Sequence, residues 1–135
     1  MSKMPEYDIP FKASDPSEIS TEVLAPIDYQ YVDRRDIEIC ISQSEFTSVC
    51  PLSGLPDFGT IIITYIPNEK IVELKSLKYY LLQYRNVGIF YEHVVNRILD
   101  DLVKVLNPKR MEILGKFTSR GGIETSVNAV FDGNT

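Results

Sequence analysis

Apolar and polar residues alternate along the segment that follows Asp36. Ile37, Ile39 and Ile41 occupy every second position, and the alternation continues loosely to Val49. A period of two is typical of a strand with one buried face, because successive side chains of a strand point to opposite faces. The segment from Asp36 to Val49 is therefore predicted to be a strand.

Turn-forming residues interrupt this pattern between Cys50 and Gly59. The stretch contains two prolines and two glycines, which predicts a loop. Residues 59–66 are rich in β-branched side chains and predict a second strand. Two further strands are predicted at residues 111–118 and 123–131, joined by a glycine-containing turn.

A helical spacing of apolar residues follows the second strand. Leu77, Leu81 and Tyr84 lie at positions i, i+4 and i+7, and Ser76 is a suitable N-cap residue. A second helix is predicted from about Ile89 to Leu106. Its apolar face includes Val95, Leu99, Leu102 and Leu106.

The segment before the first strand has a different character. Residues 1–33 contain four prolines among aspartate, glutamate and serine, which predicts an extended arm with neither helix nor strand. Residues 34–135 are predicted to form a single domain, because a chain of 135 residues has no room for a second hydrophobic core.

The predicted order of elements is β-β-α-α-β-β. This order indicates an α+β fold with an antiparallel sheet and two helices on one face. Such a sheet leaves backbone N–H and C=O groups unpaired at its edges, where neighbouring subunits can pair with them. The pattern therefore favours a ring-like homo-oligomer.

The charge and hydropathy of the chain limit its partners. The net charge is −5 and the pI is about 4.9, so no nucleic-acid partner is expected, because phosphate contacts need a basic surface. No apolar run approaches the ~20 residues that cross a bilayer, and no secretory signal is recognised. We therefore expect a cytoplasmic protein with no membrane partner.

Cysteine and histidine are scarce. The two cysteines, Cys40 and Cys50, do not form a CxxC pair, so no disulfide is expected. The only histidine is His93, so one chain cannot build a zinc site from several histidines. No metal site is predicted.

Cys50 and Asp57 are candidates for covalent chemistry. Cys50 lies at a strand end directly before a proline, and such loops present reactive groups to a cleft. A thiol beside a carboxyl group that carries a proton can add to a polar multiple bond. Position alone favours a simpler interpretation, with Cys50 as a small buried residue and Asp57 bonded to its own turn. Cys40, on the strand, fits the buried role better than Cys50.

Charged residues near the helices suggest ligand binding. Glu92 shares a helical face with apolar residues, so it is either a first-turn residue near the positive helix end or a carboxylate that binds a guanine-like ring. Lys75 and Lys78 share one face at a helix start, and with Arg120 they could hold a phosphate, although a solvated surface is commoner. No GxGxxG or GxxxxGK[ST] motif is present, so a dinucleotide would bind outside a Rossmann framework.

Several segments together resemble one known family. Residues 73–80, with the sequence ELKSLKYY, resemble the signature of the NADPH-dependent 7-cyano-7-deazaguanine reductases. Residues 50–59 are similar to the catalytic loop of that family, and Glu92 lies where the family has its substrate-binding glutamate. Arg120-Gly121-Gly122 resembles a downstream Arg-Gly-Gly, and the resemblance extends from about residue 36 to residue 131.

The resemblance implies the tunnelling fold and an oxidoreductase that reduces a nitrile. Cys50 would attack the nitrile carbon of 7-cyano-7-deazaguanine to form a thioimide, Asp57 would supply a proton, and NADPH would supply hydride. The residues implied in binding the deazaguanine are Val72, Glu73, Leu74, Tyr91 and Glu92. The residues implied in binding NADPH are Leu74, Lys75, Lys78, Arg120 and Gly121.

The resemblance also implies an assembly and a pathway. Members of this family form stacked pentameric rings with sites between subunits, and the aminomethyl product feeds queuosine synthesis for transfer RNA. The family usually has a histidine directly before the substrate glutamate, where this chain has Tyr91, which leaves the orientation of the substrate open. The alternative is a non-catalytic purine- or pterin-binding protein of the same fold, which would keep Glu92 but need neither Cys50 nor Asp57.

Overall fold

The computed structural model describes residues 13–133, in which four long strands form one antiparallel sheet. The strands lie in the order β2-β3-β5-β6, and each neighbouring pair is antiparallel. They are β2 (Ile39–Val49), β3 (Pro56–Ile66), β5 (Arg110–Arg120) and β6 (Ile123–Asp132). All four come from segments whose alternating or β-branched pattern predicts a strand.

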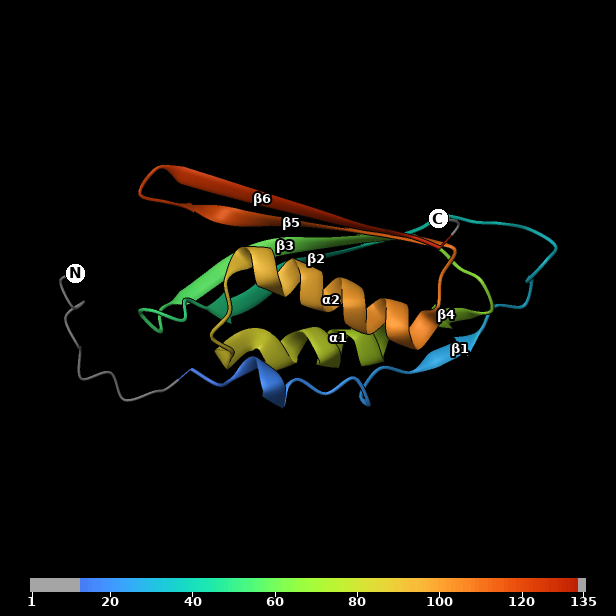
Figure 1. Ribbon diagram of the computed structural model, residues 1–135, viewed down its shortest axis with the longest axis horizontal. Coiled ribbons are helices and arrows are strands. Elements are labelled where there is room, and N and C mark those ends of the chain that lie inside the picture. Colours follow the sequence, from blue (N-terminus) through green and yellow to red (C-terminus); the bar gives the residue numbers. More distant parts are fainter. Residues whose placement is uncertain (1–12, 134–135) are drawn as a thin grey trace.

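Two helices cover one face of this sheet (Figure 1). The helix α1 (Leu74–Leu82) continues into the 3-10 helix η2 (Gln83–Asn86), and α2 (Tyr91–Leu106) follows. The core lies between helices and sheet, where side chains such as Ile61 and Ile63 of β3 are fully buried. This arrangement confirms the predicted α+β fold with two helices on one face of an antiparallel sheet. No helix within the described residues is both long enough and apolar enough to cross a membrane.

The N-terminal segment is more regular than the sequence predicted. It contains the 3-10 helix η1 (Pro16–Glu18) and the strand β1 (Pro26–Asp28), and β1 pairs antiparallel with β4 (Lys70–Val72). The expectation of an arm with neither helix nor strand is therefore wrong for these residues, because the partner strand lies far away in the sequence. Residues 1–12 of that arm lie outside the described residues. Ile19 and Leu24 are buried in the same hydrophobic core as the helices. The predicted boundary between an arm and a domain at residue 33 stays a prediction.

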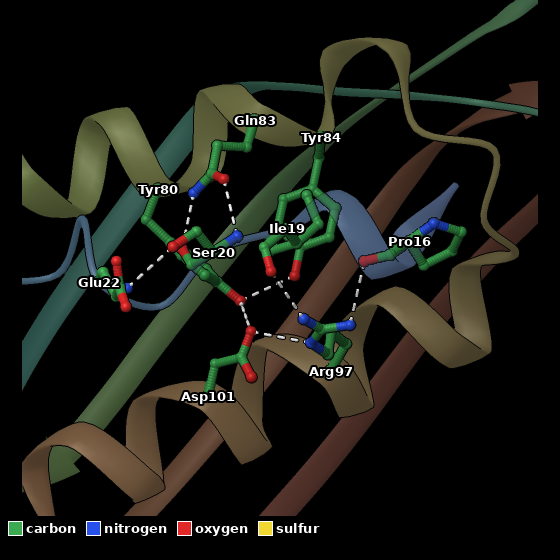
Figure 2. Close-up of polar contacts among 9 residues, drawn as sticks. All are labelled: Pro16, Ile19, Ser20, Glu22, Tyr80, Gln83, Tyr84, Arg97 and Asp101. Carbon is green, nitrogen blue, oxygen red and sulfur yellow. Dashed lines mark hydrogen bonds and ion pairs between the residues drawn. The ribbon is translucent and has the colours of Figure 1, made fainter. Parts of the chain in front are cut away.

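Hydrogen bonds tie this N-terminal segment to the helices (Figure 2). The Arg97 guanidinium of α2 donates to the backbone carbonyls of Pro16 and Ile19, each at 3.2 Å. The Gln83 side chain accepts from the Ser20 N–H and donates to the Ser20 carbonyl, both at 2.9 Å. The segment consequently lies along the side of the helices that faces away from the sheet (Figure 1).

Several element boundaries differ from the predictions, and β2, for example, begins at Ile39 and not at Asp36. The strand β3 begins at Pro56, so Asp57 belongs to a strand and not to the preceding loop. Proline is tolerated there because the first residue of a strand need not donate a hydrogen bond. The N-cap of α1 is Glu73 and not Ser76, because the Glu73 carboxylate accepts the N–H groups of Lys75 and Ser76 at 2.9 and 2.6 Å.

Candidate active site

Cys50 follows β2 and begins a tight loop. Its N–H donates to the Leu55 carbonyl at 2.9 Å, and its carbonyl accepts the Gly54 N–H at 2.8 Å. Gly54 has a φ of 71°, a conformation that glycine adopts without strain. The Val49 N–H donates to the Val87 carbonyl at 3.0 Å, which fixes the end of β2 beside the connection between the helices. The backbone on both sides of the thiol is therefore held in place.

The environment of the Cys50 thiol favours its ionised form. Burial raises the pKa of this thiol, but hydrogen bonds from Ser53 and from the Leu52 N–H outweigh burial, and the pKa lies below its ordinary value. Cys40, in contrast, is exposed on β2. The expectation that Cys40 is the buried cysteine is therefore wrong, because its neighbours Ile39 and Ile41 occupy the strand face that packs on the core.

Residues from three segments of the chain come together at the carboxyl group of Asp57. It lies opposite Ser48 in the β2–β3 pair and is only 6% exposed. Its Oδ1 atom accepts a hydrogen bond from the Tyr91 hydroxyl at 3.0 Å and pairs with Nη2 of Arg120 at 3.0 Å. Arg120 also donates to the Pro56 carbonyl. The starts of β3 and α2 and the end of β5 therefore converge on Asp57.

Electrostatic effects connect Cys50 with these residues. The charge of Asp57 acts to raise the pKa of the Cys50 thiol, against the hydrogen bonds in the loop. Burial and the bond to Asp57 raise the pKa of Tyr91, and Cys50 adds a smaller effect in the same direction. We call Cys50, Asp57, Tyr91 and Arg120 the thiol cluster.

Glu92 and Gly121 adjoin the thiol cluster in the sequence. Glu92 is exposed in the first turn of α2, while Val95 and Leu99 are buried. Within one chain, Glu92 is therefore not part of the buried apolar face of α2. Its carboxylate lies near the N-terminus of this helix, which is the positive end of the helix dipole. Gly121 and Gly122 have φ values of 56° and 82°, as the two central residues of a tight hairpin require.

The remaining candidate residues lie at the other end of the molecule (Figure 1). The Val72 N–H donates to the Tyr65 hydroxyl at 3.1 Å. Asp57 and Tyr65 are eight positions apart on β3, which at ~3.3 Å per residue separates them by about 26 Å. The residues around Val72 form a second group, which we call the helix-start cluster: Val72, Glu73, Leu74, Lys75 and Lys78.

The helix-start cluster offers exposed groups at the beginning of α1. Hydrogen bonds from the N–H groups of Ser76 and Lys75 lower the pKa of Glu73, whose side chain is occupied as the helix cap. Leu74 is 62% exposed, and Lys75 and Lys78 are exposed as well. Two exposed ammonium groups fit the phosphates of a dinucleotide such as NADPH.

Two residues beside the thiol cluster were missed by sequence reasoning. The Ser48 hydroxyl is fully buried and has no hydrogen-bond partner among residues 13–133. The Phe117 ring stacks on the Tyr91 ring, with centroids 3.9 Å apart and planes at 14°. The register of the β2–β3 hairpin would have revealed Ser48 as the neighbour of Asp57, whereas no local signal marks Phe117. Within the same residues, no group of three or more His, Cys, Asp and Glu side chains could hold a metal ion.

Comparison with known proteins gives close relatives. Residues 56–133 match the QueF family model, which is described as QueF-like protein. The chain is 58% identical over 114 residues to the NADPH-dependent 7-cyano-7-deazaguanine reductase of Caldicellulosiruptor bescii, covering 84% of this chain and 86% of that protein. It is 58% identical over 111 residues to the reductase of the same name from Chloroherpeton thalassium, covering 82% of this chain and 95% of that protein.

A solved structure supports the fold. The apo form of the archaeosine synthase QueF-Like matches with a TM-score of 0.62 at 23% identity, over 73% of this chain and 93% of that one. At this identity the likeness concerns architecture and not activity. The family model covers more than half of the chain, and each of the two relatives aligns with more than four fifths of it. The chain therefore belongs to the QueF family.

Proposed function

We propose that this protein is an NADPH-dependent oxidoreductase that reduces the nitrile of 7-cyano-7-deazaguanine to the aminomethyl group, a step in queuosine synthesis. The observation that carries the proposal is the β2–β3 hairpin, whose register brings the loop cysteine Cys50 close to the buried carboxyl group of Asp57. The lowered pKa of the Cys50 thiol supports the same role. The identity of 58% to two reductases of this name supports the same activity. A cysteine with thiolate character is the nucleophile that a nitrile carbon requires.

The chemistry begins at Cys50. Its thiolate adds to the nitrile carbon, so that a C–S bond forms and one π bond of the C≡N group breaks. The Asp57 carboxylate, which is held by Tyr91 and Arg120, takes the proton that the thiol gives up and passes it to the nitrogen, which gives a neutral thioimide attached to Cys50. Two NADPH molecules, bound in turn, would each supply one hydride, and with two protons from solvent these would convert the thioimide into the amine and free the thiol.

Substrate and cofactor contacts are assigned to both clusters. The deazaguanine is assigned to Glu92 at one end of the chain and to Val72, Glu73 and Leu74 at the other. NADPH is assigned to Leu74, Lys75 and Lys78, together with Arg120 and Gly121. Lysine and arginine suit the phosphates of the cofactor.

These assignments require a homo-oligomer. A single base cannot touch two clusters that lie about 26 Å apart along β3. We therefore propose that each site joins the thiol cluster of one subunit to the helix-start cluster of another, in stacked pentameric rings of the tunnelling fold. The strands β2 and β6, which form the edges of the described sheet, are available for pairing between subunits. The cytoplasmic location stays a prediction from the sequence.

The covalent step can be tested without the cofactor. Wild-type protein mixed with 7-cyano-7-deazaguanine in the absence of NADPH is expected to gain the mass of one substrate per chain, located at Cys50 by peptide mass spectrometry. Cys40→Ser should gain it and Cys50→Ala should not. Binding of the base without an adduct and without NADPH oxidation would contradict the proposal and would indicate a non-catalytic binding protein.

A further inference from the structure

Phe117 lies against the sheet because two neighbouring positions have no side chain. A Cβ atom at Gly59, which is paired with Phe117 across β3 and β5, would lie 2.8 Å from its ring. A Cβ atom at Gly115 would lie 2.9 Å from the same ring. Real Cβ atoms do not approach so closely, so the two glycines create the space that the Phe117 ring occupies.

Tyr91 completes this stack from the helix side. It is the first residue of α2, and its ring lies nearly parallel to that of Phe117 at a centroid distance of 3.9 Å. Phe117 is only 3% exposed, so Tyr91 stacks on a ring that is itself packed in the core. The helix start and the stacked ring together direct the Tyr91 hydroxyl to Oδ1 of Asp57, 3.0 Å away.

The Tyr91 hydroxyl is suited to hold this bond and not to release its proton. Burial and the bond to Asp57 raise the pKa of Tyr91, so the phenol stays protonated through the neutral range. Arg120 is a looser partner, because its side chain is 44% exposed, whereas the Tyr91 ring is stacked on Phe117. Of the two contacts to Oδ1, the bond from Tyr91 is the one fixed by packing.

We propose that Tyr91 is a positioning residue that holds the Asp57 carboxyl group toward Cys50, and that its hydroxyl does not contact the base. This inference rests on the proposed reductase function. It changes the role that the resemblance implies for this position, because a hydroxyl bonded to Asp57 and a ring packed on Phe117 serve the proton donor.

Tyr91→Phe keeps the stacked ring and removes only the hydroxyl. We expect kcat to fall about 10- to 100-fold, the effect of one lost hydrogen bond to a charged group, while KM for the nitrile changes less than about threefold. Formation of the Cys50 adduct without NADPH should slow by a similar factor. Tyr91→His, which keeps a ring and an N–H donor, should recover part of the lost rate.

Tyr31→Phe is the matched control, because it removes a phenol hydroxyl from an exposed side chain outside both clusters. It should behave as wild type in every assay. Tyr91→Phe with an unchanged kcat and an adduct rate equal to that of wild type would overturn the inference, as would a raised KM with an unchanged kcat, the result expected of a residue that contacts the base. Wild type that forms no adduct and oxidises no NADPH would overturn the reductase function as well.

Discussion

Cys50 and Asp57 lie at the same end of the β2–β3 pair because the six-residue loop from Cys50 to Leu55 reverses the chain between these strands. The pairing sets Asp57 opposite Ser48, two residues before the thiol. A short hairpin therefore supplies both the nucleophile and the proton donor of the proposed reaction. Tyr91 and Arg120 come from elements much later in the sequence and bind the same carboxyl oxygen.

The hydrogen bonds in this loop predict an unusually reactive thiol. In Cys40→Ser protein, alkylation of Cys50 by iodoacetamide should show a lower midpoint pH than an unstructured cysteine peptide labelled in parallel, because the folded loop lowers the pKa of the thiol. Adding Ser53→Ala should move the midpoint upward, since burial then acts against fewer hydrogen bonds. A Cys50 midpoint at or above that of the peptide, read from labelling rates between pH 6 and 10, would refute this account of the loop.

Ser48 gives a prediction about stability. Its buried hydroxyl has no partner among the described residues, so Ser48→Ala should leave the free energy of unfolding unchanged or raise it by up to about 1 kcal/mol. Ser76 is the matched control, because its hydroxyl donates to the Glu73 carbonyl at 2.7 Å and accepts the Ala25 N–H at 3.0 Å.

Ser76→Ala should therefore cost about 1–2 kcal/mol, as it leaves the N–H of Ala25 unpaired. Urea unfolding of the two variants beside wild type measures both changes. A loss at Ser48 as large as the loss at Ser76 would mean that the Ser48 hydroxyl has a partner.

The sequence predicted part of the candidate site because some of its geometry is local. Cys50 and Asp57 are close in the chain, so a loop that turns back could bring them together, although position alone favoured an aspartate bonded to its own turn. The packing of Phe117 on Tyr91 depends on the register of β5 against β3 and on the start of α2. Such a contact needs the tertiary structure, and hydrophobic periodicity carries no signal for it.

At the scale of elements, a buried polar network joins the two helices (Figure 2). The Tyr80 hydroxyl of α1 donates to Asp101 of α2 at 2.5 Å and lies 2.7 Å from the Tyr84 hydroxyl. Arg97 pairs with the same carboxylate at 2.9 Å and also holds the N-terminal segment. The network therefore links three segments that are remote in the sequence, with each polar group satisfied.

This network predicts a loss of stability in alkali. Burial raises the pKa of Tyr84 above the value of about 10 that the unfolded chain has. The stabilising contribution of Tyr84 to the free energy of unfolding is therefore fully present below pH 10. It is lost as the pH rises toward the pKa of Tyr84 in the folded chain, because Tyr84 then ionises only in the unfolded chain.

Tyr84→Phe should be less stable than wild type by about 1 kcal/mol at pH 8, and the difference should narrow between pH 9 and 11. Urea unfolding as a function of pH measures both quantities. A constant difference across this range would show that Tyr84 ionises equally in the folded and unfolded chains.

The long elements were predictable because each carries its own periodic pattern. The four sheet strands and the two helices appear where alternation or a helical spacing indicates them. The strands β1 and β4 have three residues each and exist only because residues 26–28 pair with residues 70–72. Glu73 became the cap of α1 where Ser76 was expected, since both residue types can accept N–H groups and only the path of the chain decides between them.

At the scale of the whole molecule, the two clusters occupy opposite ends of one subunit (Figure 1). The proposed function needs both, so the subunit should be active only in an assembly. Mixed assemblies test this directly. Cys50→Ala and Lys75→Ala proteins should each be inactive, or nearly so, by themselves.

When the two variants are unfolded together and refolded, random pairing should restore intact sites to about a quarter of the positions, because a site takes one cluster from each of two subunits. The rate of NADPH oxidation by the mixture measures the recovered activity. A mixture of Cys50→Ala and wild type that is refolded in the same way serves as the reference for this rate. No recovery in correctly assembled mixtures would mean that each chain supplies a whole site by itself.

The most direct test of the central claim is the loss of NADPH absorbance when 7-cyano-7-deazaguanine is added to wild type and to Cys50→Ala in parallel. The covalent reductase account predicts that wild type consumes two NADPH for each nitrile and that Cys50→Ala consumes none, although it still binds the base. NADPH oxidation that persists in Cys50→Ala would contradict the role of Cys50, and no oxidation by wild type would contradict the reductase function.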